Sequence, residues 1–117
     1  MAGNDRCLFC RIVNDEIPAK KVHADADVVA FQDINPQAPT HVLVIPRKHI
    51  ASLDALTDAD ATTIGTTLVR AAGIARELHL ETDGYRIVCN NGEAAGQTVF
   101  HIHFHILGGR NFGWPPG

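Results

Sequence analysis

Near its end the chain reads Thr98-Val99-Phe100-His101-Ile102-His103-Phe104-His105-Ile106-Leu107. Histidines and apolar residues alternate strictly, as do side chains on the two faces of a β-strand, so we predict a strand from Thr98 to Leu107. Four apolar residues are expected to face the core and to fix the register: Phe100, Ile102, Phe104 and Ile106. Three histidines share the opposite face, with neighbours roughly 6–7 Å apart: His101, His103 and His105.

Three imidazoles on one rigid face are costly to bury unless they are hydrogen-bonded, protonated or bound to a metal. Two functional interpretations follow. Histidine is the commonest metal ligand, and three histidines can hold zinc. Alternatively, one neutral imidazole is a nucleophile toward phosphorus or an acyl carbon, which requires a hydrogen bond that orients its far nitrogen. The strand itself leaves both interpretations open.

The segment before the strand, Asn90 to Thr98, consists mostly of small and polar residues and contains Gly92 and Gly96. Backbone N–H groups of such a loop can surround phosphate oxygens, and Asn90 and Thr98 add polar side chains. No P-loop lysine pattern or dinucleotide fingerprint is present, which excludes ATP or NAD binding of those kinds. Beside three aligned histidines, a phosphate site is favoured over an ordinary hairpin connection.

The rest of the chain predicts a single α+β domain over residues 1–117 with a mostly antiparallel sheet. A flexible N-terminus is expected at 1–6 and an irregular tail at 108–117. Helices are expected over 7–15 and over 58–80, the second with Thr57 as its N-cap, and further strands over 20–24, 28–34, 41–45 and 85–89. The strand at 41–45 is apolar on both faces and should be central. The long helix should bury one apolar stripe: Ile64, Leu68, Ala71, Ala75 and Leu78.

The composition is that of an ordinary globular protein. The 117 residues are 45% hydrophobic and 20% charged, with a net charge of −3 when histidine is neutral. This mild negative charge argues against a nucleic-acid or acidic-membrane surface. No apolar run reaches the length of a membrane span, and the first residues lack a secretory leader, so a cytoplasmic location is expected.

Three cysteines are present, at Cys7, Cys10 and Cys89, which argues against a disulfide framework. The pair Cys7-Leu-Phe-Cys10 is half of a zinc site, a redox motif or two reduced core residues. The redox interpretation is the weakest, because no strand precedes the pair. Cys89 lies in an apolar run and is expected to be an ordinary buried residue.

Several motifs together resemble the histidine triad (HIT) superfamily of nucleotide hydrolases and transferases, in particular its Hint branch. The resemblance covers Cys7 to Gly117 and rests on the following stretches: Cys7-Leu-Phe-Cys10-Arg-Ile, Phe31-Gln-Asp33-Ile34-Asn-Pro-Gln-Ala-Pro-Thr-His41, Ile45-Pro-Arg-Lys-His49-Ile, Gly96-Gln-Thr98, His101 to Leu107 and Trp114-Pro-Pro-Gly117. It implies a five-stranded antiparallel sheet with two helices, and a homodimer in which the sheet is continuous. It also implies hydrolysis of purine nucleoside phosphoramidates to AMP.

The resemblance assigns roles to individual residues. His103 matches the nucleophile that takes AMP as a covalent nucleotidyl-histidine, and His101 and His105 match its supporting histidines. The remaining nucleotide positions are Asp33 and Ile34 at the nucleoside, Asn90, Gly96, Gln97 and Thr98 at the phosphate and leaving group, and Trp114 at the partner subunit's site. His105 or Thr98 is the expected proton donor to the leaving amine. The expected ligands are purine nucleotides such as AMP and GMP, or their phosphoramidates.

Bacterial members are similar in pairing a CxxC with two histidines, which implies a structural zinc site. Its ligands would be Cys7, Cys10, His49 and His101, and His101 would then be structural instead of directly catalytic. The other histidines, His23, His41 and His79, are interpreted as ordinary surface or strand-end residues.

Two alternatives remain. One is a dinucleoside polyphosphate hydrolase or phosphorylase of the same superfamily, against which the Trp-Pro-Pro ending speaks. The other is a zinc-binding interaction module without turnover, against which the phosphate-type loop speaks.

Overall fold

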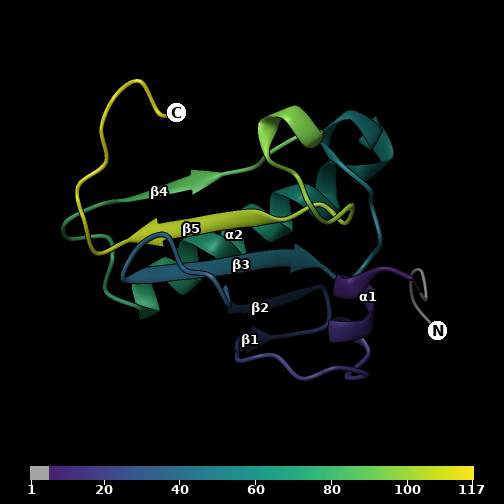
Figure 1. Cartoon of the computed structure of the whole chain (residues 1–117). Coiled ribbons are helices and arrows are strands. Elements are labelled where there is room, and N and C mark those ends of the chain that lie inside the picture. Colours follow the sequence, from purple (N-terminus) through teal and green to yellow (C-terminus); the bar gives the residue numbers. More distant parts are fainter. Residues whose placement is uncertain (1–5) are drawn as a thin grey trace.

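A computed structural model describes residues 6–117, so all of the expected flexible N-terminus except Arg6 lies outside the described residues (Figure 1). Five strands form one antiparallel sheet in the order β1-β2-β3-β5-β4. Their bounds are Lys21–Ala24 for β1, Val28–Gln32 for β2, Thr40–Pro46 for β3, Tyr85–Val88 for β4 and Phe104–Gly108 for β5. The predicted α+β class and the central place of the strand after Thr40 are confirmed.

Two α-helices cover the sheet from opposite faces: α1 (Leu8–Val13) and α2 (Ala61–Glu77) (Figure 1). Val29 and Phe31 of β2 pack in one cluster with α1, whereas Val28 and Ala30 pack in another with α2. Because successive side chains point to opposite faces, a strand covered on both faces must be apolar throughout. This explains why the central strands read as continuous apolar runs.

The last strand begins later than predicted. It starts at Phe104 instead of Thr98, and residues 98–103 are irregular. The ladder pairs Val44 with Phe104, so it would next run toward Pro46, which has no N–H to continue it. Phe100 is consequently 48% exposed and is not part of the core. The prediction that His101, His103 and His105 share one strand face was therefore wrong.

The long helix is also displaced from its prediction. A 3₁₀ turn over Asp58–Asp60 precedes α2, and Thr57 and Asp60 form a capping box that confirms the predicted N-cap. The predicted apolar stripe is wrong in part, because Leu68 and Leu78 are exposed. Ala71 and Ala75 are buried as predicted, and the other buried residues of the helix are Thr67 and Ile74.

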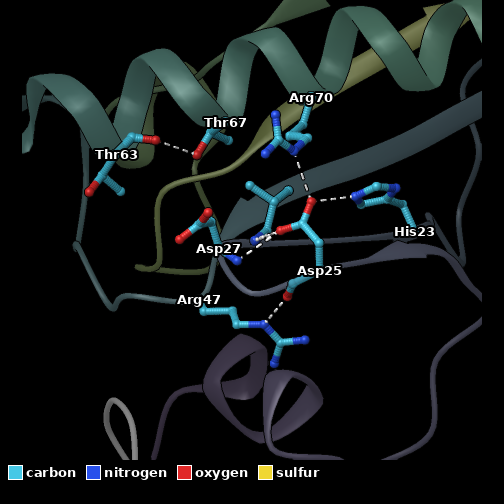
Figure 2. Close-up of polar contacts among 8 residues, drawn as sticks. His23, Asp25, Asp27, Arg47, Thr63, Thr67 and Arg70 are labelled. Carbon is cyan, nitrogen blue, oxygen red and sulfur yellow. Dashed lines mark hydrogen bonds and ion pairs between the residues drawn. The ribbon is translucent and has the colours of Figure 1, made fainter.

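A polar cluster ties the turn between β1 and β2 to helix α2 (Figure 2). The Asp25 carboxylate accepts hydrogen bonds from the backbone of Asp27 and Val28 and from Arg70 Nε at 2.9 Å, and lies 2.6 Å from His23 Nε2. Its carbonyl accepts a bond from Arg47 at the end of β3. Burial by itself raises the pKa of Asp25, but these bonds together hold it well below its usual range.

Replacing Asp25 with asparagine is expected to reduce the free energy of unfolding by about 1–3 kcal/mol, because charged hydrogen bonds to Arg70 and His23 are lost. The loss should shrink as the pH falls below about 4, since the folded carboxylate has the lower pKa and its stabilisation disappears when it is protonated. Urea unfolding at pH 7 measures the effect. The matched control is Asp27→Asn, whose exposed side chain makes none of these contacts; equal losses in both variants would contradict the assignment.

Among residues 6–117, no helix has the length and hydrophobicity needed to cross a membrane. The homodimer implied by the resemblance stays a prediction.

Candidate active site and metal centre

A cleft of about 930 Å³ opens between α1, the end of β2 and the loop that precedes β5. The side chains that form its apolar walls come from α1, β2 and β3: Leu8, Phe9, Ile12, Phe31 and Leu43. Its polar lining includes Asp33, Thr98, His103 and His105. A largely apolar cavity with a few convergent polar groups is typical of a small-molecule site.

His103 is held in one tautomer. Its Nδ1 lies 2.8 Å from the carbonyl oxygen of His101, which can only accept, so Nδ1 carries the proton and donates it. The lone pair is therefore on Nε2. Burial lowers the pKa of His103 below its usual value, against the opposing effects of this hydrogen bond and of the Asp33 charge. The ring is neutral near pH 7, as a nucleophile requires.

His105 is oriented by His41, which sequence reasoning had treated as an ordinary histidine. The backbone N–H of Gln37 donates to His41 Nδ1 at 3.0 Å, so the His41 proton is on Nε2 and points to His105 Nδ1 at 2.9 Å. The remaining His105 proton is then on Nε2. That atom is buried and, among the described residues, has no hydrogen-bond partner.

Burial is also the main reason that the pKa of His105 falls to about 4, with smaller contributions from His103 and His41. The pKa of His41 is lowered by burial too, and the nearby Asp33 partly opposes this. Asp33 Oδ2 lies 3.4 Å from His41 Nε2, so the carboxylate and both imidazoles form one connected group. The oxygen and nitrogen atoms that these three side chains could offer to a metal ion all lie within 4.8 Å of one another.

A second group of side chains lies on the far side of α1. The potential ligand atoms of Cys7, Cys10, His49 and His101 all lie within 4.8 Å of one another. Nδ1 of His101 is 3.5 Å from Cys7 Sγ and 3.4 Å from Cys10 Sγ, and Nδ1 of His49 is 3.2 Å from Cys10 Sγ. A tetrahedral zinc ion with ordinary bond lengths separates sulfur and nitrogen ligands by about 3.5 Å. The four predicted ligands are thus brought together at close to the required spacing.

The donor set fits zinc in its chemistry as well as its spacing. His101 Nε2 lies 2.8 Å from the carbonyl of Pro46, so it donates that proton and leaves the Nδ1 lone pair toward the thiols. Burial lowers the pKa of His101 to about 4, which keeps the ring neutral. Two thiols and two neutral imidazoles form a closed Cys2His2 set, which is typical of structural zinc.

Comparison with known proteins now identifies the family. The HIT domain family matches residues 14–112. The chain belongs to the HIT family. It is 50% identical over 110 residues to an uncharacterized HIT-like protein of Synechocystis, covering 94% of this chain and 96% of that protein. It is 45% identical over 112 residues to a 14 kDa zinc-binding protein of Zea mays, covering 94% and 87%.

Solved structures of HIT proteins agree. A HIT family hydrolase from Legionella pneumophila superposes with a TM-score of 0.94 at 49% identity, covering 96% of this chain and 100% of that one. A histidine triad nucleotide-binding protein from Candida albicans has a TM-score of 0.79 at 34% identity, covering 95% and 84%. The predicted HIT fold with five antiparallel strands is therefore confirmed.

Within this HIT domain, the loop before β5 divides its predicted residues between two tasks. Gly96, with a φ of 97°, and Thr98 line the cleft. Gln97 is buried, and its side-chain amide donates to the carbonyls of Ala51 and Val99 and accepts from Gly92 N–H. Its backbone N–H donates to the Gly92 carbonyl. Gln97 thus braces the loop, and these groups are not free for a ligand.

Three other predicted nucleotide residues are placed less centrally. Ile34 is fully exposed at the rim of the cleft. Asn90 and Trp114 are not among the described residues that line it, and Trp114 is 84% exposed. A Cβ on Gly96 would lie 3.6 Å from Asn90 Nδ2, so the Asn90 side chain lies next to Gly96.

The remaining predicted histidines and the third cysteine lie outside both groups. His79 is exposed, and His23 belongs to the Asp25 cluster. Cys89 is a free, half-buried thiol whose pKa burial raises to about 11, so it is protonated and unreactive near pH 7.

His41 is the site residue that sequence reasoning missed. It lies on β3, two residues from Leu43, which pairs directly with His105. Residues two apart on a strand share a face, so pairing of β3 with β5 places His41 next to His105. The signal was present in the alternation of His41 and Leu43, but using it required knowing that these two strands are neighbours.

Proposed function

We propose that this protein hydrolyses purine nucleoside phosphoramidates to AMP and an amine through a covalent nucleotidyl-histidine. The observation that carries the proposal is His103, whose ring is neutral, oriented through Nδ1 and open to the cleft through Nε2. Such an imidazole can attack phosphorus without a metal and divide the hydrolysis into two displacements.

In the first displacement, His103 Nε2 attacks the α-phosphorus and a P–N bond to the ring forms as the P–N bond to the amine breaks. The departing nitrogen needs a proton, and His105 Nε2–H is the unpaired donor beside the nucleophile, with the Thr98 hydroxyl as the other donor on that wall. In the second, a water oxygen attacks phosphorus, the bond to His103 breaks, and the water proton returns to His105. AMP and the free enzyme are the products.

The walls of the cleft suit a purine nucleoside. Phe9, Ile12 and Phe31 offer apolar surface for a base, and the Asp33 carboxylate is a natural acceptor for ribose hydroxyls. Ile34 at the rim can cover the nucleoside. The nucleotide-binding name of the Candida relative and the hydrolase name of the Legionella relative support this assignment.

The charge of the cleft favours a substrate with one phosphate over a dinucleoside polyphosphate. Among the described residues that line the cleft, Lys20 is the one lysine or arginine, and the negative charge of Asp33 offsets its positive charge. A polyphosphate chain with several negative charges would find no cluster of cations, whereas neutral imidazoles and N–H groups suffice for one phosphate.

Initial rates on AMP-lysine, or an adenosine phosphoramidate, and on diadenosine polyphosphates test this preference for a substrate with one phosphate. Faster turnover of the polyphosphates would favour the alternative enzyme, and no turnover with no inhibition by AMP would favour a zinc-binding interaction module.

We also propose that Cys7, Cys10, His49 and His101 hold a structural zinc ion. The geometry of the donor set supports this, as does the name of the maize relative. When bound, zinc would cross-link α1 to the segment before β5 and would take no part in the chemistry at phosphorus. A homodimer in which the exposed Trp114 of one subunit reaches the partner's cleft completes the proposal.

The rate should depend on pH in a way that reflects the buried histidines. Burial holds the pKa of His103 below its usual value and lowers that of His105 to about 4. Protonation would remove the lone pair of His103, so we expect kcat/KM to be constant near neutral pH and to fall along an acid limb centred below pH 6.5. Initial rates corrected for spontaneous P–N hydrolysis measure this. An acid limb centred at 6.5 or higher would show that the nucleophile is an unperturbed imidazole.

A further inference from the structure

The metal centre and the cleft are built from opposite sides of the same two segments. Helix α1 and its N-cap give Cys10 and Cys7 to the metal centre, and the same helix gives Phe9 to the wall of the cleft. The irregular segment before β5 gives His101 to the metal centre and His103 to the cleft. A displacement of either segment at one site must therefore alter the other.

The link through the second segment is a single hydrogen bond. The carbonyl of His101 accepts the Nδ1 proton of His103 at 2.8 Å and so sets its tautomer. The β3–β5 ladder begins only at Phe104 and does not hold this carbonyl. It is held by one backbone bond, from Ile102 N–H to Ile50, by the packing of buried Ile102, and by the ring of His101, which is fixed between Pro46 and the two thiols.

The link through the helix is an aromatic contact. The Phe9 ring meets the His103 ring edge-on, with centroids 5.1 Å apart, and lies 6.1 Å from the His101 ring. Helix α1 has six residues, and so short a helix is not stable on its own. Its placement depends on core packing on one side and on the cysteines on the other.

We propose that the metal centre controls the cleft: an ion held by Cys7, Cys10, His49 and His101 fixes both the carbonyl that orients His103 and the helix that carries Phe9. His101 is then a positioning residue, which acts on the nucleophile through its backbone while its ring holds the metal. The proposal rests on the proposed function in taking zinc as the ion of the metal centre and AMP as the ligand of the cleft.

The tautomer of His103 tests the backbone link without any nucleotide. We would record two-bond ¹H–¹⁵N spectra of the histidine rings for the zinc-loaded protein, the same protein after zinc removal by a chelator, and the His49→Gln variant. His49 is a ligand that does not line the cleft. A single Nδ1–H tautomer of His103 is expected with zinc and a mixture without it or in His49→Gln. The matched control, His79→Asn at an exposed position, should give the zinc-loaded spectrum. An unchanged single tautomer in folded, zinc-free protein would overturn the proposal.

Linkage provides a second test that needs only the folded, zinc-loaded protein, so it remains valid if zinc removal unfolds the chain. Coupling between two sites is reciprocal, so AMP must tighten zinc by the factor by which zinc tightens AMP. We expect AMP to tighten zinc binding about tenfold, which is the lower end of the effect on metal affinity of residues that contact the metal ligands. Competition between the protein and a zinc chelator is measured with and without saturating AMP, with a blank titration for zinc binding to AMP itself.

Zinc affinity that is equal within about twofold in both conditions would show that the metal only stabilises the fold, and would overturn the proposal. Failure of AMP to bind the zinc-loaded protein would count against the proposed function instead. The tautomer measurement would then decide the coupling by itself.

Discussion

Replacing His103 with asparagine is expected to lower turnover of an adenosine phosphoramidate by at least about 10⁴-fold, because the proposed nucleophile is lost. AMP binding should stay within a few fold, since the apolar walls and the loop before β5 are unchanged. Steady-state rates and calorimetric titration with AMP measure the two effects. His103→Ala should behave in the same way.

Two controls make this result specific. His79→Asn is the same replacement at an exposed position and should retain full activity. Rapid quenching of the wild-type reaction followed by peptide mass spectrometry should place the AMP adduct on His103. Full activity of His103→Asn, or an adduct on another residue, would remove the nucleophile assignment.

Loss of the metal is expected to have the largest effect on stability. An ion that binds only the folded state at about 1,000 times its dissociation constant adds about 4 kcal/mol to the free energy of unfolding. For a domain of this size that corresponds to a melting temperature on the order of 10–20 °C higher. Chelation or Cys10→Ser should remove this stabilisation, because Cys10 is buried and its thiol contacts both histidine ligands.

Thermal unfolding and elemental analysis of untagged protein check this prediction. Cys89→Ser is the matched control, since Cys89 lies outside the metal centre and its variant should retain one zinc ion per chain. Fully folded wild-type protein that contains no zinc would contradict the assignment of all four ligands.

How far the fold could be predicted depended on where the controlling interactions lie along the chain. Local patterns predicted the central strand, the N-cap at Thr57 and the α+β class, since apolar runs and capping residues act on their own neighbours. The five-stranded sheet was implied by the resemblance to the HIT family. The start of β5 could not be predicted from its own residues. It depends on Pro46, which lies far away in sequence and ends the ladder that β5 would otherwise continue.

The prediction of an apolar stripe on the long helix was wrong in part for a related reason. Hydrophobicity alone placed Leu68 in the core, but the structure leaves Leu68 exposed and buries its neighbour Thr67. Thr67 takes the buried place because its hydroxyl donates to the Thr63 carbonyl at 2.8 Å and so needs no other partner (Figure 2). A side chain that satisfies its own polar group is not visible as apolar in the sequence.

The residues that matter most are evident from the sequence: the histidine repeat, the Cys7 and Cys10 pair, and the motifs that resemble the HIT family. How they are divided between the two sites became evident only from the folded chain. The tertiary structure turned the His101 ring toward the cysteines and His103 into the cleft, and it joined His41 to His105. It also assigned the ring protons of His41, His101, His103 and His105. The reason is that tautomer and orientation are set by partners far away in sequence, such as the Pro46 carbonyl for His101 and His41 for His105, which come near these rings only when the strands have paired.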